Sequence, residues 1–450
     1  MSSSVSFRSA TAPGLSDQPA RAARPDFGVW AAINRAAGSV QGGGAARRVL
    51  PPERWLVRLL LRELGHPPIA IVLWDGEAIG HPAPVARVIV RDRPALLGLV
   101  LNPDLYFGDG YAAGRIEVGG DLLALLEAVY RAGPACEKPP GLLGRLLEQV
   151  RRRRSNTLAG ARSNIHHHYD IGDDFYRLWL DRELVYTCAF FASPQQTLEE
   201  AQRAKMDLVC RKLWLRPGES VVEAGCGWGA LALFMARNYG VSVKAYNVSH
   251  EQIKHARARA RAEGLDDRVE FIEDDYRNIR GRFDCFASIG MLEHVGPDHY
   301  RELGTVIDRC LSPAGRGLLH AIGRDYPGRI NAWIERRIFP GAHPPSLRQM
   351  LEVLEPWSFS VLDVENLRLH YAETLRHWLA RFEAAGQSVV AMFDQVLLRA
   401  WRLYLTGSIA GFTTGSLQLF QVLFARHASN GIPWTRQRLE VRSQESGVRS

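Results

Sequence analysis

A glycine-rich loop near the middle of the chain lies between a strand-like and a helix-like segment. It contains Gly225, Gly227 and Gly229, and it follows the apolar segment 220–224, in which Glu223 stands two residues before the first glycine. Glycines let a ligand approach the backbone closely, and the helix that follows directs its first amide groups toward an anionic group. The third glycine comes one residue earlier than in the dinucleotide-binding pattern. We therefore expect a cofactor-binding loop here, with a tight turn that binds nothing as the alternative.

The spacing of these glycines and the acidic residue resembles the S-adenosylmethionine (SAM) motif of class I methyltransferases. The next strand-like segment ends at Asn247, where nucleotide-binding folds usually hold an acid for the ribose hydroxyls. A neutral amide can also pair with a diol. The resemblance implies that Glu223 and the three glycines contact SAM, and that the methionine carboxylate faces the helix N-terminus.

Further segments make the resemblance more specific. In this order along the chain, they closely resemble the cyclopropane-fatty-acyl-phospholipid synthases and the related mycolic acid cyclopropane synthases. The segments are 168–176 (HYDIGDDFY), 186–191 (YTCAFF), 291–297 (MLEHVGP), 319–323 (LHAIG) and 370–375 (HYAETL). With the glycine loop, the resemblance covers about residues 49–435.

The resemblance implies methyl transfer from SAM to the cis double bond of an acyl chain, followed by proton loss and ring closure. The methylated alkene is a carbocation, so the site must exclude water and offer a base that is not a competing nucleophile. In this family the base is a bound bicarbonate ion, and Glu293 with His320 would set its protonation state while the Tyr371 ring lies near the cation. The residues that would hold the ion here are Cys188, Glu293, His320, Tyr371 and the backbone amide of Ile322. A plain acid–base dyad is not distinguishable from this arrangement by sequence.

By the same resemblance, a further set of residues would touch SAM, and the last two would lie beside the adenine. They are Tyr186, Thr187, Asn247, Ser249, Gln252, Asp275 and Tyr276.

Several chemistry-bearing residues also have plainer interpretations. Cys188 could be a small core residue, and we interpret Cys226 as one. The adjacent residues 166–168 (HHH) do not share a helix face, so we predict no metal site there. Ser408 stands where many family members carry a cysteine, which excludes a thiol nucleophile at that point. The same change could mark a different product, either a methyl-branched or a methylene chain.

The chain divides by composition and pattern into several parts. We predict a flexible leader (1–48), a small lipid-associated α+β domain (49–132), a linker (133–164) with a basic run at 151–154, a catalytic domain (165–435) and a tail (436–450). The alternation of helices and apolar strands from 197 onward is typical of a parallel α/β sheet. The predicted fold class is therefore α/β: a class I SAM-dependent methyltransferase (Rossmann-like) domain with helical insertions, preceded by a small α+β domain.

The elements that must position these residues follow from periodicity and turn signals. In the small domain we predict a helix over 52–64, a strand over 69–74, a hairpin turn at Asp75-Gly76 with both residues at positive φ, and a helix capped by Asp121. Past Pro340 we expect mostly helices, and the pattern leaves 417–424 open between strand and helix. The predicted elements of the catalytic domain are strands 220–224, 241–247, 269–273, 283–289 and 317–322, a helix from Ala230, and a helix over 251–263.

The composition is that of a folded protein with a basic surplus. Hydrophobic residues make up 46% and charged residues 23% of the 450 residues, which excludes a disulfide-stapled miniprotein and a fibrous repeat. Lys plus Arg number 56 against 48 Asp plus Glu, a net charge of +8 that favours nucleic acid or an acidic membrane face. The longest apolar runs fall far short of the ~18 residues that a spanning helix needs. The six cysteines are scattered, which indicates reduced thiols.

These observations favour one class of function over two others. We predict a SAM-dependent C-methyltransferase of unsaturated phospholipid acyl chains, cytoplasmic and peripheral at the anionic inner membrane face, with a homodimer as a further expectation. A nucleic-acid methyltransferase fits the charge, but the sequence has no N/D-P-P-Y motif and no Pro-Cys nucleophile, and 102–106 (NPDLY) lies outside the SAM domain. We therefore expect no nucleic-acid partner. A catalytically dead lipid-binding protein would require the intact ion-holding set to be inert.

Overall fold

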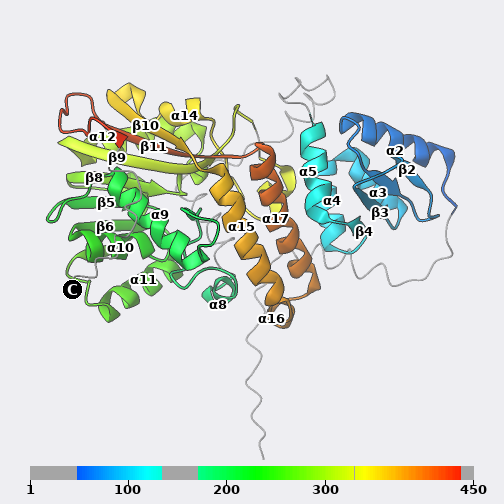
Figure 1. Cartoon of the computed structure of the whole chain (residues 1–450), viewed down its shortest axis with the longest axis horizontal. Helices are drawn as coiled ribbons and strands as arrows, with labels where there is room; N and C mark the ends of the chain where they lie inside the picture. The colour runs from blue at the N-terminus through cyan, green and yellow to red at the C-terminus, as the bar shows by residue number, and fades with distance from the viewer. Residues whose placement is uncertain (1–47, 134–170, 329, 437–450) are drawn as a thin grey trace, which may run out of the picture.

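A computed structural model of the protein describes residues 48–133, 171–328 and 330–436. It shows a small unit with a four-stranded sheet and a larger unit with a seven-stranded sheet (Figure 1). The predicted leader up to residue 47, the basic run 151–154, the triple histidine 166–168 and residues 437–450 of the tail lie outside the described residues.

The small unit packs helices on a mixed sheet of order β2-β1-β3-β4. Strand β1 pairs antiparallel with β2 and parallel with β3, and β3 pairs antiparallel with β4. The predicted capping of α5 is confirmed, because the Asp121 carboxylate accepts from the amide of Leu123. The elements are α2 (Pro51–Glu63), β1 (Ala70–Val72), β2 (Ala78–Gly80), β3 (Ala86–Val90), α3 (Arg93–Leu101), α4 (Pro103–Ala112), β4 (Ile116–Gly120) and α5 (Leu122–Ala132).

The predicted hairpin is present, but its turn differs from the prediction. The amide of Gly76 donates to the carbonyl of Leu73 at 2.9 Å, so the two central turn residues are Trp74 and Asp75. Gly76 has φ +87°, whereas Asp75 is not among the residues at positive φ. The prediction of positive φ at both Asp75 and Gly76 is therefore wrong: only the glycine adopts the left-handed conformation, directly after the turn.

The larger unit is built on a sheet of order β10-β11-β9-β8-β5-β6-β7. Strands β5 to β9 pair in parallel, and β11 runs antiparallel to both of its neighbours. Its strands are β5 (Ser220–Ala224), β6 (Ser242–Asn247), β7 (Val269–Glu273), β8 (Phe283–Ile289), β9 (Leu311–Gly323), β10 (Phe359–Asn366) and β11 (Gln418–Arg426). The sequence predicted a sheet of parallel strands. The structure differs from this prediction in one strand, β11, which runs antiparallel.

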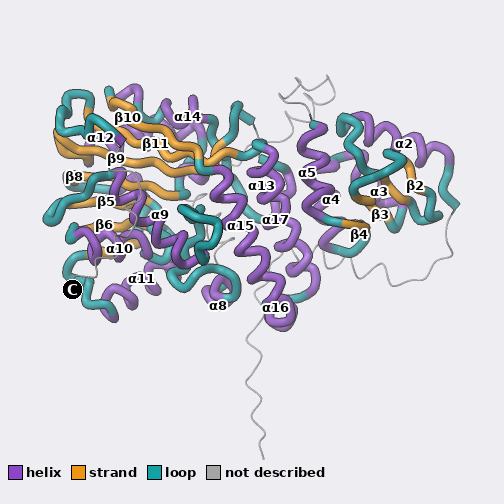
Figure 2. The backbone as a smooth tube through the Cα atoms, viewed as in Figure 1, coloured by secondary structure: helices purple, strands orange, loops and turns teal. Residues whose placement is uncertain are grey.

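Helices cover this sheet, and two of them separate it from the small unit. Figure 2 shows α15 and α17 standing between the larger sheet and α4 and α5. The helices of the larger unit are α8 (Asp173–Arg177), α9 (Leu198–Lys212), α10 (Ala230–Tyr239), α11 (His250–Ala262), α12 (Tyr300–Cys310), α13 (Ala332–Arg337), α14 (Leu347–Leu351), α15 (Arg368–Ala384), α16 (Gly386–Met392) and α17 (Gln395–Thr414). Short 3-10 turns are η1 (Tyr276–Asn278), η2 (Leu292–His294), η3 (Pro297–His299) and η4 (Glu355–Trp357).

Segment 417–424, which the pattern left open, is a strand. Every residue of β11 except the last is buried, since the strand lies inside the sheet with further layers on both faces. Burial on both faces removes the alternation by which a strand is normally recognised. Strand β10 was also missed in the region expected to be mostly helical.

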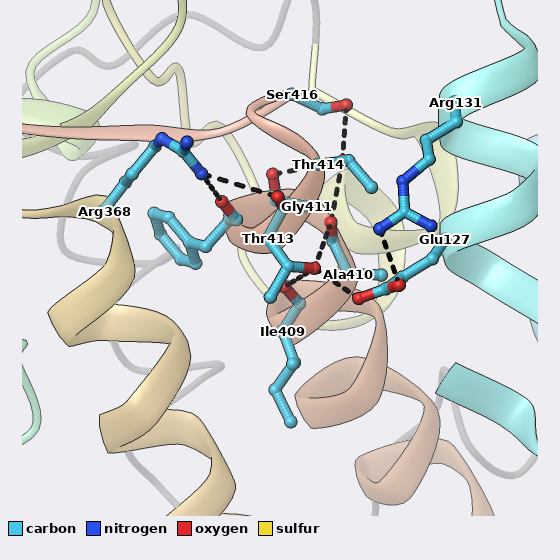
Figure 3. Close-up of polar contacts among 10 residues, drawn as sticks. Glu127, Arg131, Arg368, Ile409, Ala410, Gly411, Thr413, Thr414 and Ser416 are labelled. Atoms are coloured by element: carbon cyan, nitrogen blue, oxygen red, sulfur yellow. Dashed lines mark hydrogen bonds and ion pairs between the residues drawn. The ribbon is translucent and has the colours of Figure 1, made fainter. Parts of the chain in front are cut away.

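Polar contacts join the small unit to helix α17. At its C-terminal end, the Thr413 hydroxyl donates to Glu127 of α5 at 2.6 Å, and Arg131 pairs with the same carboxylate (Figure 3). On the other side of this helix end, the Arg368 guanidinium of α15 donates to the carbonyl of Phe412 at 2.7 Å. Carbonyls of a last helical turn lack partners within the helix, so this contact satisfies one of them.

A second contact between the units involves α4 and α13. The Asp109 carboxylate accepts two bonds from the Arg337 guanidinium, at 3.0 and 2.7 Å, and one from the Trp333 indole at 3.1 Å. Gly108 makes this approach feasible, because a Cβ at that position would lie 2.5 Å from the Trp333 ring. The two units therefore meet through specific side chains as well as apolar packing.

None of the helices in the described part of the chain is long and apolar enough to cross a membrane.

Candidate active site

The glycine loop follows β5 and leads into α10, as predicted. Gly225, Gly227 and Gly229 all have positive φ, at +86°, +53° and +85°. The amide of Gly225 donates to the carbonyl of Tyr246 on the neighbouring strand at 2.9 Å. Residues with a side chain rarely adopt these conformations, so the sequence of the loop directly determines its shape.

The polar residues predicted to touch SAM after β6 lie at or next to this loop. Asn247 donates to Gln252 at 2.7 Å and to the carbonyl of Gly227 at 3.3 Å. Ser249 is buried at the start of α11. These contacts bring the end of β6 and the first turn of α11 against the glycine loop.

Asp275 and Tyr276 follow β7 and are both buried. The Asp275 carboxylate accepts from the amide of Arg277 at 2.9 Å and pairs with its guanidinium at 3.1 Å. The Tyr276 hydroxyl has no hydrogen-bond partner among the described residues. A buried hydroxyl without a partner is unusual, and it marks this edge of the sheet as a place where a ligand could complete the bonding.

Glu223 is buried at the end of β5, and one of its carboxylate oxygens, Oε2, lacks a partner in the described structure. Burial raises the pKa of Glu223 to about 8, against the opposing effect of the Lys205 charge. The Lys205 side chain is buried as well and donates to the Thr187 hydroxyl at 2.9 Å. Burial lowers the pKa of this ammonium to about 8. Lys205 therefore anchors Thr187, one of the predicted SAM contacts.

Glu293 lies on the turn η2 after β8. Its Oε1 atom accepts from the backbone amide of Ile322 at 2.6 Å, and its Oε2 atom has no partner within the described chain. Burial raises the pKa of Glu293 to about 7. The carboxyl group can therefore either hold or release a proton near neutral pH. The Ile322 amide, predicted to bind an ion, is already engaged by this carboxylate.

His320 lies on β9 and is buried. Its Nδ1 atom lies 3.0 Å from the side-chain amide nitrogen of Gln421, and its Nε2 atom has no partner among the residues the structure describes. Burial, together with the charges of Lys205 and Lys212, lowers the pKa of His320 well below its usual range. The imidazole is therefore neutral at physiological pH.

Tyr371 and Cys188 occupy different positions relative to these groups. The Tyr371 ring of α15 stacks on Phe412 of α17 with centroids 4.7 Å apart, and Tyr371 lines the cavity described below. The Cys188 thiol donates to the carbonyl of Ala189 at 3.1 Å, and Cys188 is not among the cavity-lining residues. Burial raises the pKa of this thiol far above its usual range, so it is not a thiolate.

A cavity of about 620 Å³ extends from Glu293, His320 and Tyr371 to residues of the small unit. Six of the predicted site residues line it: Tyr186, Thr187, Glu293, His320, Ile322 and Tyr371. The glycine loop lies next to it, since a Cβ on Gly225 would come within 2.8 Å of Met291, the second residue before Glu293. The predicted residues that do not line the cavity are Cys188, Glu223, Gly225, Gly227, Gly229, Asn247, Ser249, Gln252, Asp275 and Tyr276.

The rest of the cavity wall was not predicted. Apolar side chains come from both units: Phe107 of α4, Leu126 and Val129 of α5, Trp333 of α13 and Leu403 of α17. The wall is thus shared between segments that are far apart in the sequence.

Ser408 also lines this cavity. Its hydroxyl donates to the carbonyl of Tyr404 at 2.8 Å, one turn earlier in α17. The Tyr404 hydroxyl lies 2.9 Å from that of Tyr186. Ser408 is therefore a polar group on the wall whose bond is satisfied within its own helix.

Two buried lysines of α9 were also missed by sequence reasoning. Lys205 and Lys212 are both fully buried, at 2% and 1% exposure. They are seven residues apart, which puts them on the same side of the helix. The sequence offered one indication of their burial: each lysine directly precedes a residue of the apolar helix face that Met206, Val209 and Leu213 define.

No group of three or more His, Cys, Asp or Glu side chains in the described segments could hold a metal ion.

Comparison with known proteins identifies a family. The model of the family described as mycolic acid cyclopropane synthetase matches residues 157–422, and a domain of unknown function matches residues 56–136. A probable fatty acid methyltransferase of Pseudomonas putida is 35% identical over 395 residues, which is 83% of this chain and 96% of that protein. The cyclopropane-fatty-acyl-phospholipid synthase of Escherichia coli K12 is 40% identical over 266 residues, covering 59% of this chain and 68% of that enzyme.

Solved structures agree with this assignment. The mycolic acid cyclopropane synthase CmaA1, crystallised with SAH and CTAB, superimposes with a TM-score of 0.56 at 31% identity, covering 59% of this chain and 98% of that one.

Proposed function

The chain belongs to the mycolic acid cyclopropane synthetase family and is a SAM-dependent methyltransferase, and we propose that it adds a methylene group across cis double bonds of phospholipid acyl chains. The observation that carries this proposal is the cavity, whose wall combines the buried polar groups Glu293 and His320 with apolar side chains from both units, alongside charged side chains such as Glu63 and Arg324.

The size and lining of the cavity suit a long apolar ligand. Its volume of about 620 Å³ falls within the range of small-molecule sites, roughly 300–1,000 Å³. An acyl chain could lie against Phe107, Leu126 and Trp333 with its double bond beside Glu293 and His320. A bound chain would also displace water from the reacting carbons, which a carbocation requires.

The polar end of the cavity fits a small oxyanion such as bicarbonate. His320 Nε2 and Glu293 Oε2 are both buried and lack partners in the described chain, so each can bond a ligand atom. Tyr371 lines the same cavity. When bound, bicarbonate would supply a base that accepts a proton without attacking the cation. Because the Ile322 amide bonds Glu293, its role would be to orient that carboxyl group.

The residues around the double bond would stabilise charge in the reaction. The alkene carbon gains the methyl group from the sulfonium of SAM, S-adenosylhomocysteine leaves, and loss of one methyl proton closes the ring. The stacked rings of Tyr371 and Phe412 present aromatic faces that attract a cation. The neutral His320 adds no positive charge that would oppose the carbocation.

We also propose that the protein reaches its substrate by peripheral contact with the membrane. Leu97 and Leu101 lie one turn apart on α3 and are 45% and 77% exposed, and Tyr106 of α4 is 43% exposed nearby. The same α4 contributes Phe107 and Gly108 to the cavity wall. An exposed apolar patch next to a cavity wall, together with a net charge of +8, supports contact with an anionic lipid surface.

The test is the lipid profile of cells that express the protein. Mass spectrometry with fragmentation should show acyl chains that have gained one CH2 at former double bonds, with no such gain in cells that express Glu293→Gln. A methyl branch would establish the related product instead. An unchanged profile with abundant folded protein would contradict the proposal.

A further inference from the structure

We propose that Gln421 and Lys212 are positioning residues that hold the proton of His320 on Nε2, so that the imidazole is a fixed hydrogen-bond donor toward the cavity. The role assigned to this donor rests on the proposed function, in which the cavity is the active site. Neither residue lines the cavity.

We call Lys212, Glu365, Gln421 and His320 the relay. Its three strand residues lie in one row across the sheet. In the register of the strands, Glu365 of β10 faces Gln421 of β11, and Gln421 faces His320 of β9. Side chains at directly paired positions of neighbouring strands project from the same face and lie close together. Lys212, the last residue of α9, reaches this row from the helix packed on that face.

Hydrogen bonds connect the row from its half-exposed end to the active site. The Lys212 ammonium donates to Glu365 Oε2 at 2.5 Å and to Gln421 Oε1 at 2.7 Å. Gln421 Nε2 lies 3.0 Å from His320 Nδ1. A second carboxylate, Asp363, lies 3.9 Å from the ammonium, so the buried cation is paired on two sides.

The chemistry of these groups permits one arrangement of protons. An ammonium only donates hydrogen bonds, so it must face the oxygen of the Gln421 amide. The opposite orientation would place the amide NH2 against the ammonium. The NH2 therefore faces His320, and because it also only donates, Nδ1 must be the acceptor. A neutral imidazole with a bare Nδ1 carries its proton on Nε2.

This proton has two consequences in the cavity. His320 Nε2, which has no partner among the described residues, becomes a donor that can bond an oxyanion beside Glu293. The other tautomer would instead present a bare nitrogen lone pair to the cavity. Such a lone pair would repel an anion, and it would be a nucleophile next to a carbocation and a methyl sulfonium. The relay therefore protects the imidazole from alkylation as well as orienting it.

The direct test is the 15N spectrum of the full-length protein labelled in its histidine side chains. The His320 signals are assigned by their loss in His320→Gln. We expect a neutral imidazole with the proton on Nε2. A neutral imidazole with the proton on Nδ1, or an imidazolium, would overturn the proposal without any variant of the relay being needed.

Gln421→Glu is the sharpest variant, because it keeps the shape and the bond to Lys212 while removing the donor to Nδ1. The carboxylate should draw a proton to Nδ1, giving either the other tautomer or an imidazolium, and either supports the relay. Persistence of the neutral wild-type pattern would overturn it. Gln418→Glu is the matched control: the same substitution in the same buried strand, at a residue bonded to Asn366 and Gly415.

Kinetics separate positioning from a general effect on folding. Gln421→Glu should lower kcat by about 10- to 100-fold, with little change in KM for SAM. This is the range found when a group that orients a metal-binding histidine is replaced. Lys212→Met should act in the same direction, because the amide is then free to turn. Wild-type kcat in both variants would contradict the role in catalysis. Since the spectra need no turnover, the predicted tautomer in a protein that does not alkylate lipid would refute the proposed function and leave the relay intact.

Discussion

The indole of Trp333 donates to Asp109 Oδ1 at 3.1 Å, so a carboxylate of the small unit fixes a side chain of the larger unit that lines the shared cavity. The same carboxylate accepts two bonds from Arg337. One residue of α4 thus holds both ends of α13 against the small unit. This contact makes the geometry of the cavity depend on how the two units pack.

Asp109→Ala should therefore impair lipid turnover more than SAM binding. Loss of the charged hydrogen bonds should cost about 1.5–3 kcal/mol of unfolding free energy. A displaced Trp333 should lower kcat/KM for lipid by about 10- to 100-fold, because small misplacements of a binding wall are costly. The measurements are vesicle-based kinetics and calorimetry with SAM.

Asp75→Ala provides the control for this substitution. Asp75 pairs with Arg54 at 2.8 Å, but within the small unit and away from α3. Its loss should reduce stability with little effect on lipid kinetics. Equal kinetic losses in the two variants would show that general destabilisation explains the effect.

Glu293→Gln should abolish turnover while SAM binding persists. The substitution keeps a polar group for the Ile322 amide but removes the group that can exchange a proton near neutral pH. Loss of a positioned acid or base typically costs about 10²- to 10⁴-fold. We expect a fall of that size in kcat with an unchanged calorimetric Kd for SAM. Glu270→Gln, at an exposed residue of β7 that pairs with Lys244, is the control, and full activity in Glu293→Gln would mean that the carboxyl group has no part in the reaction.

The stability of the protein should also depend on pH through Glu293. Burial raises the pKa of this carboxyl group from 4.5 to about 7. Because the folded state holds the proton more tightly, the group favours folding most below pH 4.5, and this contribution is lost as the pH rises through about 7. The difference between these two pKa values corresponds to about 3 kcal/mol of unfolding free energy, at about 1.4 kcal/mol for each tenfold change in proton affinity.

Comparing the pH dependence of stability in the wild type and in Glu293→Gln separates the effect of Glu293 from the titration of other buried carboxyl groups such as Glu223. Chemical denaturation between pH 4.5 and 8 should show the wild type losing about 3 kcal/mol relative to the variant. Parallel pH profiles for the two proteins would contradict a buried, proton-binding Glu293.

Much of the larger unit could be predicted from sequence because its elements have local signals. Strand 220–224 has the predicted limits, since a glycine loop follows it and Pro217-Gly218 precedes it. The three loop glycines predict their own backbone conformation. The register of β9, β10 and β11 has no such signal, because each strand pairs with residues distant in the sequence.

The residues that sequence reasoning missed depend on long-range contacts. Helix α4 contains Gly108, a residue type that normally indicates a turn, yet a glycine is required here because a Cβ would lie 2.5 Å from the Trp333 ring. Gln421 lies 101 residues from His320 and 209 from Lys212. Their relation becomes visible only when the strands are paired.

Leu101→Glu should weaken binding to vesicles if α3 touches the membrane. The side chain is 77% exposed, so the change should not affect folding. Loss of one buried leucine at a lipid surface should cost roughly 1.5–3 kcal/mol of binding free energy. Cosedimentation with anionic vesicles measures this, and added salt should weaken binding further by screening the basic surplus.

Leu369→Glu, at an exposed leucine of α15, is the matched control. Equal vesicle binding by both variants and the wild type would show that the α3 surface is not the contact.

The most direct test of the central claim is turnover of cis-unsaturated phosphatidylglycerol vesicles by the purified protein with SAM deuterated in its methyl group. Ring closure removes one deuteron from the transferred methyl, so we predict an acyl chain that carries a CD2 bridge between the former alkene carbons, located by fragmentation. A product that retains the whole CD3 group would show that the chain makes a methyl branch. Recovery of unmodified lipid by protein that binds SAM would contradict the claim that phospholipid acyl chains are its substrate.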